Sequence, residues 1–330
     1  MMNKQILFLL LFTLLAVSCS DEKLSTDSVV DSYRGQHEET ELDTWIYKHI
    51  TKPYNIAVEY RWDRNYAQAE SYTYPPKSDK VKAVLETIKY LWLETYTQPN
   101  IGGPDFMKGK APIRIYMFGG KNLDANGVEL ICNANAAATE MYIYNVNTFD
   151  PANSEKIFIL MRSVHHQFAK RLMDIFPYNR DAFMSISQRR YTFASDVIAS
   201  AIRNTLDPHE RFGLNDYASN NAFFTFHSFF SPTDDFAEII SSIITNTPAD
   251  IKKAELNAKK PYSYEENEDE EIKNQYKKEA EQAYKEFVEK KMFVEQYFEK
   301  NVGIKLSRLQ LVSLKRMGDF VKKNNKSKVS

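Results

Sequence analysis

The sequence predicts an α+β protein in which a mixed sheet comes first and a mainly helical part follows. Up to residue 150 the chain holds segments of alternating apolar and polar residues, which are typical of strands, and one segment of helical periodicity. After Pro151 the strand pattern stops, and apolar residues recur at intervals of three and four. Strands followed by helices favour the α+β class over an alternating α/β arrangement.

The composition excludes several classes of function. The 330 residues carry 43 basic and 44 acidic side chains, so the net charge of −1 offers nothing to attract a nucleic acid. We therefore expect no nucleic-acid partner. Two cysteines cannot make a disulfide framework or a four-thiolate zinc site, and six histidines leave room for a sparse metal site.

The N-terminus carries an export signal. Lys4 precedes an apolar run from Ile6 to Val17 that is too short for the roughly 20 residues that span a bilayer. We interpret residues 1–18 as a signal peptide. Ala16-Val17-Ser18-Cys19 resembles a bacterial lipobox, so we expect cleavage before Cys19 and acylation of its thiol. The alternative is an ordinary signal peptide with an incidental cysteine.

The mature chain then has a tether and one domain. Residues 19–40, which include the acylated cysteine, are polar and predict a tether, and Ser20-Asp21-Glu22 resembles the export signal of surface-exposed lipoproteins. Residues 41–330 predict a single domain, with a sheet-containing lobe at 41–150 and a helical lobe at 151–330. No later segment is apolar enough to span a bilayer, so lipid on Cys19 is the membrane attachment we predict.

The sheet-containing lobe is predicted to alternate short helices and strands. Pro53, Pro75-Pro76 and Gly119-Gly120 separate its elements. In order, we expect a short helix from Trp45, a strand over Tyr54–Trp62, a helix over Val81–Trp92, and strands over Pro112–Phe118 and Glu140–Val146.

The second lobe is predicted to be helical. We expect helices over Ile157–Ile175, Arg190–Asn204 and Asp235–Asn246, a long amphipathic helix marked by Ala280 to Met292, and a short helix over Leu306–Val321. The acidic run Glu265–Glu271 predicts a solvated loop rather than a calcium site, because no glycine interrupts it. The lysine-rich tail from Lys322 is expected to fray.

The helix over Ile157–Ile175 carries an altered metal motif, Ser163-Val164-His165-His166-Gln167-Phe168-Ala169-Lys170. In H-E-x-x-H, two histidines at i and i+4 share one helix face and bind zinc, while the Glu takes a proton from the zinc-bound water. Here His166 stands at the first ligand position, Gln167 at the base position and Lys170 at the second ligand position.

Short segments in a particular order give the motif its context. They are Leu42–Ile46, Lys52–Ile56, Tyr60–Asp63, Ile113–Gly120, Tyr144–Asn147, His165-His166, Phe212-Gly213, Tyr217-Ala218, Asp234–Glu238 and Thr245–Pro248. In this order the chain resembles lipoproteins described as putative zinc-binding metallopeptidases, which accompany starch-utilisation-type nutrient importers in the outer membrane of gut bacteria. The resemblance extends over most of the mature chain.

The resemblance implies a zincin-like fold, zinc as the cofactor and an outer-membrane location. The family pattern is H-H-E-F-A-H on the helix and E-D-F-A-E downstream, where an acidic residue is the third zinc ligand. Carried over by position, His166 matches the first ligand. Glu238, or Asp234 four residues earlier on the same face, matches the third. Gln167 and Lys170 depart from the pattern.

These departures predict an inactive site. Glutamine cannot accept a proton from zinc-bound water, and losing a positioned acid–base group costs about 10² to 10⁴ in rate. An ammonium at Lys170 has no lone pair for a metal and would repel it. One histidine and one carboxylate are too few for a catalytic zinc, so we expect zinc to be absent here.

Lys170 also suggests a positive role. Its ammonium would stand near the acidic segment, and we hypothesise that it pairs with Glu238 or Asp235. Such a pair would keep the two helices together without metal.

Other candidates have ordinary interpretations. His165 points about 100° away from His166 and is expected to pack in the interior. His209 and His227 would rebuild a site with His166 only if the fold brings them together. The aromatic segment Phe223–Phe230 predicts core packing, with a ligand-binding rim as the alternative, and Cys132 predicts a buried thiol.

The function we predict is therefore a lipid-anchored binding or accessory component of nutrient uptake, with importer components as partners. A peptide or a glycan-linked peptide would pair with an exposed strand, for which Tyr142 and Tyr144 are candidates. The alternatives are an active metallopeptidase with an altered site and a scaffold without a ligand site.

Overall fold

The computed structural model describes residues 39–61, 74–191, 195–261 and 269–329. The chain divides into two units, Met1–Asp43 and Thr44–Ser330, and the fold is given for the second. The predicted signal peptide, Cys19 and most of the tether lie outside the described residues. No helix within the described ranges is long and apolar enough to cross a membrane.

A small mixed sheet holds four strands in the order β1-β2-β6-β5. These strands are β1 (Ala57–Glu59), β2 (Arg114–Met117), β5 (Cys132–Ala134) and β6 (Glu140–Ile143). β1, β2 and β6 run parallel, whereas β5 is antiparallel to β6, with Asn133 opposite Tyr142. β3 (Asn122–Leu123) and β4 (Glu129–Leu130) form a separate antiparallel pair.

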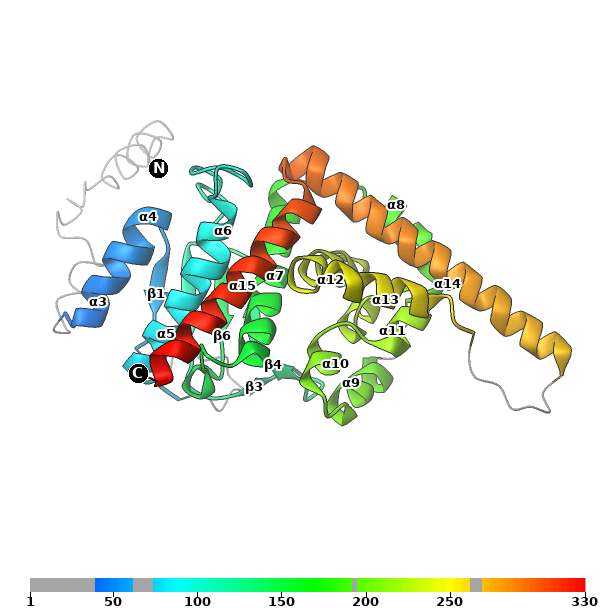
Figure 1. Cartoon of the computed structure of the whole chain (residues 1–330), viewed down its shortest axis with the longest axis horizontal. Helices are drawn as coiled ribbons and strands as arrows, with labels where there is room; N and C mark the ends of the chain where they lie inside the picture. The colour runs from blue at the N-terminus through cyan, green and yellow to red at the C-terminus, as the bar shows by residue number, and fades with distance from the viewer. Residues whose placement is uncertain (1–38, 62–73, 192–194, 262–268, 330) are drawn as a thin grey trace, which may run out of the picture. The chain divides into compact units, whose positions relative to one another are not determined.

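Helices make up most of the rest, and Figure 1 shows their arrangement. Before β2 lie α3 (Glu41–Ile46), η1 (Tyr47–Thr51), α4 (Lys52–Tyr54), α5 (Ser78–Ile88), η3 (Lys89–Leu93) and α6 (Glu94–Tyr96). After β6 follow η4 (Val146–Thr148), α7 (Ser154–Ile175), α8 (Arg180–Ile186), η5 (Gln188–Arg190), α9 (Ser195–Asn204), α10 (Pro208–Phe212), α11 (Asp216–Asn220) and η6 (Phe226–Phe229). The last are α12 (Pro232–Thr245), α13 (Pro248–Ala258), α14 (Glu270–Tyr297), η7 (Phe298–Val302) and α15 (Leu306–Val329).

The core centres on α7 and α12. α7 packs on β5 and on α12, and α12 also packs on α14 and α15 (Figure 1). Every residue of α12 from Asp235 to Thr245 is buried, and the apolar ones among them fill the space between these helices. Because α12 is buried on all sides, its acidic residues must find cationic or hydrogen-bonding partners inside the protein.

The predicted order of sheet and helices is confirmed, but several boundaries are wrong. The first predicted strand shrinks to β1, because Lys52–Tyr54 is helical and Asn55 takes a left-handed conformation. Of the helix predicted from Arg190, Tyr191 is not helical and Ser195–Asn204 is, while residues 192–194 lie outside the described ranges. α15 stays helical to Val329, so the expected fraying from Lys322 is wrong.

The sequence pattern did not predict several helices and strands. The helices α8, α10 and α11 and the strands β3, β4 and β5 were not predicted, because each is too short to show a period. α13 was not predicted because polar residues, among them Glu255 and Asn257, lie on its buried face and weaken the apolar pattern. Glu270 and Glu271 start α14 behind the N-cap Asp269, whose carboxylate accepts a bond from Glu271. The predicted acidic loop is therefore wrong at its end, and residues 265–268 lie outside the described ranges.

The free edge of the sheet beside α7 is β5, not β6. Tyr142 lies on β6, which pairs with β2 on one side and β5 on the other, and Tyr144 follows it directly. The two rings stack on Tyr116 and Phe118 of the neighbouring strand segment. The expectation that Tyr142 and Tyr144 form an exposed edge is therefore wrong.

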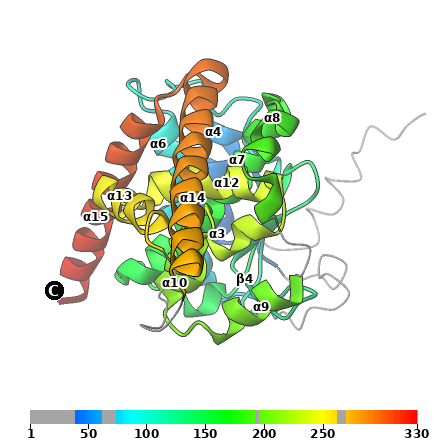
Figure 2. The ribbon, with the colours of Figure 1, turned by 90° about the vertical axis from the view of Figure 1, so that its right-hand side faces the viewer.

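α14 is held to α12 by a buried ion pair. Lys290 Nζ lies 2.9 Å from Asp235 Oδ2, and both side chains are 0% exposed. Tyr191 donates a second hydrogen bond to the same oxygen, and the Lys290 ammonium lies 3.9 Å from the centre of the Phe223 ring. Figure 2 shows α14 passing in front of α12 and α13. Burial raises the pKa of Asp235 and lowers that of Lys290, so each charge depends on the other.

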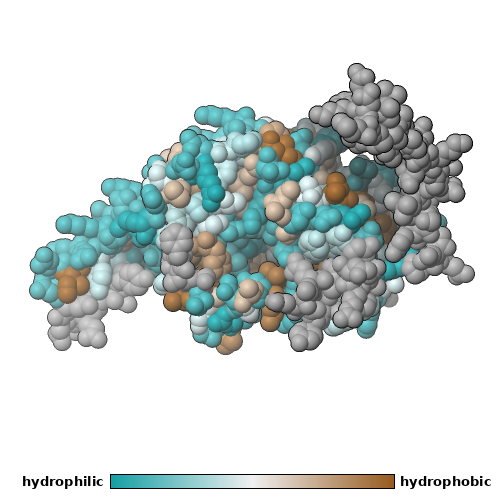
Figure 3. Space-filling view, turned by 180° about the vertical axis from the view of Figure 1, so that it is seen from behind, coloured by the Kyte–Doolittle hydropathy of each residue, from teal (hydrophilic) through white to brown (hydrophobic). Residues whose placement is uncertain are grey.

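The face drawn in Figure 3 is largely hydrophilic where its residues are described. On the face drawn in Figure 3 the hydrophobic residues form separate spots among hydrophilic ones. Scattered exposed apolar residues of this kind are normal for a folded protein and indicate no binding surface.

Replacing Lys290 tests the buried pair. Lys290→Ala leaves the carboxylate of Asp235 buried without its cation, and we expect a loss of about 3–5 kcal/mol in unfolding free energy. The double variant Lys290→Met with Asp235→Leu should recover part of that loss. Urea unfolding measures both. The exposed Lys285 on the same helix is the control, and Lys285→Ala should change stability by less than about 0.5 kcal/mol. An equal loss in both alanine variants would contradict the assignment.

Candidate functional site

Two helix faces meet at the predicted site. On α7, Arg162, His166 and Lys170 follow one another at intervals of four and therefore share one face. On α12, Asp234 and Glu238 are also four residues apart. Ser231 begins α12 as its N-cap, with Pro232 in the first turn, and this fixes where the acidic face starts.

Glu238 is surrounded by protein partners. Its Oε2 accepts a hydrogen bond from Thr225 Oγ1 at 2.9 Å and is in ion-pair contact with the Arg162 guanidinium. Its Oε1 lies 2.9 Å from His166 Nδ1, although the angle is not that of a hydrogen bond. The Arg162 and Glu238 side chains are only 4% and 3% exposed. One carboxylate oxygen of Glu238, Oε2, is therefore occupied by Thr225 and Arg162, in a site closed to water.

Asp234 pairs with Lys170. Lys170 Nζ donates to Asp234 Oδ1 at 2.7 Å, and Ser231 Oγ donates to Oδ2 at 2.6 Å. His166 Nε2 lies 3.8 Å from the same Oδ1. The predicted cationic link between α7 and α12 exists, but the partner predicted for Lys170 was wrong. Glu238 is taken by Arg162, and Asp235 faces α14, because consecutive residues of a helix point about 100° apart.

Gln167 does not point to the acidic helix. Its Nε2 donates at 3.2 Å to the backbone carbonyl of Cys132, the first residue of the edge strand β5. At the position of the general base, the side chain thus ties α7 to the sheet. A neutral amide that is engaged in this way offers no group to accept a proton.

The electrostatics favour a neutral histidine. Burial lowers the pKa of His166 well below its usual value, and the positive charges of Lys170 and Arg162 lower it further. Burial, the largest single effect, would raise the pKa of Asp234, but the charges of Lys170 and His166 and the hydrogen bonds from Lys170 and Ser231 together lower it, and the pKa falls overall. Burial lowers the pKa of Arg162 to about 9, so its guanidinium stays charged at neutral pH. The site therefore holds two cations, two carboxylates and a neutral imidazole.

The residues present do not fit a zinc ion. Among the described residues, no group of three or more His, Cys, Asp and Glu is arranged to hold a metal. Asp234 and Glu238 already contact cations, and Lys170 offers a charged ammonium where the pattern requires a histidine. A catalytic zinc needs three protein ligands with free lone pairs, and this arrangement does not supply them.

The remaining histidines are separated by the fold. His165 is fully buried and contacts the hydroxyl of Tyr96 through Nδ1 at 3.3 Å, in agreement with interior packing. His227, on η6, lies close enough for the charges of Arg162, Asp234 and Lys170 to shift its pKa, which burial lowers to about 4. His209 stacks on Phe158 at 4.8 Å, away from the acidic face. A site that unites His166 with both His209 and His227 does not form.

The other predictions near the site have mixed outcomes. Cys132 is a buried free thiol, as predicted, and burial raises its pKa to about 12. Phe223, Phe226 and Phe229 lie in the core, which agrees with the packing interpretation of the aromatic segment.

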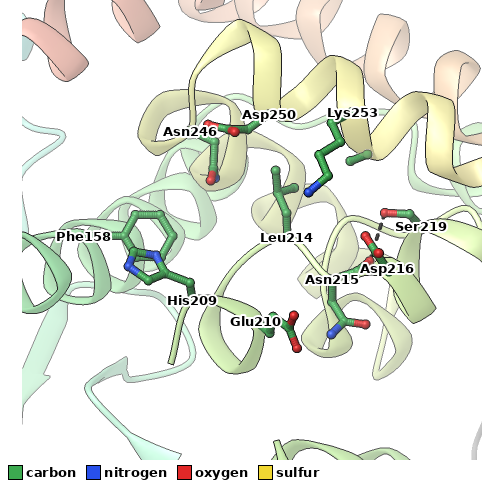
Figure 4. Close-up of a pocket in the computed structure, with 11 residues that line it drawn as sticks. Phe158, His209, Glu210, Leu214, Asn215, Asp216, Ser219, Asn246, Asp250 and Lys253 are labelled. Atoms are coloured by element: carbon green, nitrogen blue, oxygen red, sulfur yellow. Dashed lines mark hydrogen bonds between the residues drawn. The ribbon is translucent and has the colours of Figure 1, made fainter. Parts of the chain in front are cut away.

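A pocket of about 300 Å³ opens elsewhere, between α7, α10, α11 and α13. Figure 4 shows the His209 and Phe158 rings on one side and Lys253 reaching in from α13. None of Gln167, Lys170 and Glu238 lines it. Its polar groups largely serve local structure, as where Asn215 caps α11 and Ser219 donates to the Asn215 carbonyl.

Together, a histidine-bearing central helix, an opposing acidic helix and a small mixed sheet define a metallopeptidase-like protein. A model of the family described as putative zinc-binding metallo-peptidase matches residues 35–307. The chain belongs to this family. No curated protein matches it.

A solved structure supports the fold. The crystal structure of a putative zinc-binding metallo-peptidase from Bacteroides caccae superposes with a TM-score of 0.60 at 19% sequence identity. The match covers 86% of this chain and 96% of that chain. At this identity the likeness concerns the fold alone.

Sequence reasoning missed Arg162. Arg162 lies four residues before His166, one turn outside the metal motif, so the motif itself does not point to it. Thr225 and the Cys132 carbonyl have no sequence signal, because each reaches the site from a distant segment and Cys132 contributes a backbone atom.

Because His165 is buried, we expect the free energy of unfolding to depend on pH. Burial lowers the pKa of His165 to about 3, whereas in the unfolded chain it titrates near 6.5. The unfolded state therefore binds more protons below pH 6.5, and stability is lost as the pH falls from about 6.5 towards 3. His165→Phe should remove about 2 kcal/mol of the stability difference between pH 7 and pH 5, as measured by urea unfolding.

Comparing the variant with itself at the two pH values cancels any packing cost of the new ring. An unchanged pH difference would show that His165 is not held neutral by burial.

Proposed function

We propose that this chain is a catalytically inactive member of the putative zinc-binding metallopeptidase family that acts as a lipid-anchored binding or accessory component of nutrient uptake. The observation that carries this proposal is the ion pair between Lys170 and Asp234. A side chain at a ligand position that is charged and already paired cannot bind the metal on which hydrolysis depends.

The environment of Gln167 supports inactivity independently. Hydrolysis by a zincin-type site needs a base beside the metal-bound water, and the amide of Gln167 is instead bonded to the Cys132 carbonyl. Restoring a histidine at position 170 alone would thus leave the base missing. Two separate requirements of the reaction are unmet.

A binding role fits the exposure of the site. The Lys170 and Asp234 side chains are 34% and 26% exposed, whereas Arg162 and Glu238 are closed off. Gln167, on the same helix as Lys170, reaches the edge strand β5, which among the described residues pairs within the sheet with β6 alone. An extended peptide or a glycan-linked peptide would add to such an edge through main-chain hydrogen bonds.

The proposal has three further parts. The chain is attached to the outer membrane through Cys19, it contacts importer components, and active relatives use a zincin-type mechanism. Their support is the resemblance in sequence and the lipobox-like segment before Cys19.

Peptide hydrolysis tests inactivity directly. The purified mature chain should contain far less than one zinc per chain by elemental analysis. It should also cleave a mixture of fluorogenic peptides no faster than a His166→Ala variant, with or without a chelator, because neither base nor metal is in place. Near-stoichiometric zinc, or chelator-sensitive turnover that His166→Ala abolishes, would favour the active metallopeptidase instead.

Detergent partitioning tests the anchor. In a bacterial host with lipoprotein processing, the wild-type chain should enter the detergent phase of a Triton X-114 extraction and take up labelled fatty acid. Cys19→Ser should lose both properties. Cys132→Ser, which alters the buried thiol, is the matched control and should keep them. Fatty acid in the Cys19→Ser variant would disprove lipidation at this cysteine.

A further inference from the structure

The face of α7 that bears His166 carries a second cation that the family pattern does not explain. Arg162 lies one turn before His166, and Lys170 lies one turn after it. Each reaches a different carboxylate of α12, so that Arg162 contacts Glu238 and Lys170 contacts Asp234. His166 stands between them and approaches both acids, at 2.9 and 3.8 Å.

We infer that Arg162 and Lys170 together replace the metal ion as the internal cations of this site, and that Arg162 is the residue that keeps zinc away from Glu238. The inference rests on the proposed metal-free function and extends it, because it names a residue outside the motif as the cause. It makes the site a permanent ion-pair ladder, Arg162–Glu238 and Lys170–Asp234, between α7 and α12.

Charge balance supports the inference. The two carboxylates need about two positive charges in a buried setting, since an unpaired buried ion is strongly destabilising. Arg162 and Lys170 supply those charges, since each contacts one of the two carboxylates. A divalent cation added to this set would face two fixed positive charges at close range, and both carboxylate groups already contact one of them.

The charge of the arginine side chain explains the choice at the deeper position. A guanidinium stays charged when buried, whereas a lysine ammonium loses its proton more readily. Arg162 is 3% exposed, and the ion pair found for it among the described residues is with Glu238. At position 170 a lysine can carry the charge, because a third of its side chain is exposed and solvent can hydrate the ammonium.

The deeper pair also explains why restoring the motif is not enough. Gln167→Glu with Lys170→His recreates the zinc pattern of α7, but Glu238 remains in contact with Arg162. The third ligand is then still occupied by a cation. Removing Arg162 frees the carboxylate and eliminates the repelling charge.

Three proteins test the inference, each analysed for zinc per chain after incubation with zinc chloride and dialysis. The wild type and the double variant Gln167→Glu/Lys170→His should stay below about 0.1 zinc per chain. The triple variant, which adds Arg162→Leu, should approach about one zinc per chain and melt at a higher temperature in the presence of zinc. In the control, Arg171→Leu replaces Arg162→Leu and removes an arginine that pairs with Asp174 on the same helix. That control should remain free of zinc.

The outcomes separate the two proposals. Equal zinc in the double and triple variants, or none in a folded triple variant, would overturn the role of Arg162 and leave the proposed inactivity of the wild type standing. Stoichiometric zinc in the wild type would overturn both.

A second measurement tests the inference if the triple variant does not fold. Arg162→Met alone should lower the melting temperature by roughly 10 °C, because Glu238 is left buried and unpaired. Arg162→Met with Glu238→Met should recover at least half of that shift. Additive losses would show that the two side chains do not form the pair, and the inference would fail.

Discussion

The fold depends on how the buried helix α12 satisfies its acidic residues. Asp235 and Glu238 lie in the interior and Asp234 lies at its margin, so these carboxylates must meet cations that come from other helices. On α7, Arg162 pairs with Glu238 and Lys170 pairs with Asp234. On α14, Lys290 pairs with Asp235. The helical rotation between neighbouring residues sends Asp234 and Asp235 to different partners. One acidic segment thus fixes the position of α12 against two helices.

These ion pairs fix how α7 and α12 align more than they increase the free energy of unfolding. Burying a charge costs several kcal/mol, and a well-placed partner does little more than recover that cost. An apolar interface between α7 and α12 would tolerate a shift by one residue, whereas the ladder of Arg162, Lys170 and their carboxylates pairs in one register. Thr225 and Ser231 add hydrogen bonds that orient the two carboxylates. In relatives that bind zinc, the metal would perform the same task.

Sequence alone predicted the fold class, the long helices and the four positions that define the altered motif. The long helices were accessible because their apolar periodicity extends over several turns, as in Ile157–Ile175. β5 was not, because three residues carry no period, and its place at the sheet edge follows from pairing with β6. The partner of Lys170 was mistaken because helical spacing places Asp234 and Glu238 on one face but does not reveal which of the two lies opposite. That choice depends on the relative axial position of the two helices, which only tertiary packing sets.

The balance of charge also limits what the site can recognise. With its carboxylates paired and its histidine neutral, the ladder presents little net charge to a ligand, so binding there cannot depend on attraction between opposite charges. What remains accessible is the Lys170–Asp234 end and the neighbouring strand β5, one of whose carbonyls is already bonded to Gln167. A ligand that pairs with this strand would have to displace that amide or start beyond Cys132. If a ligand binds at this strand, as proposed, its main chain must form enough hydrogen bonds to compete with that amide.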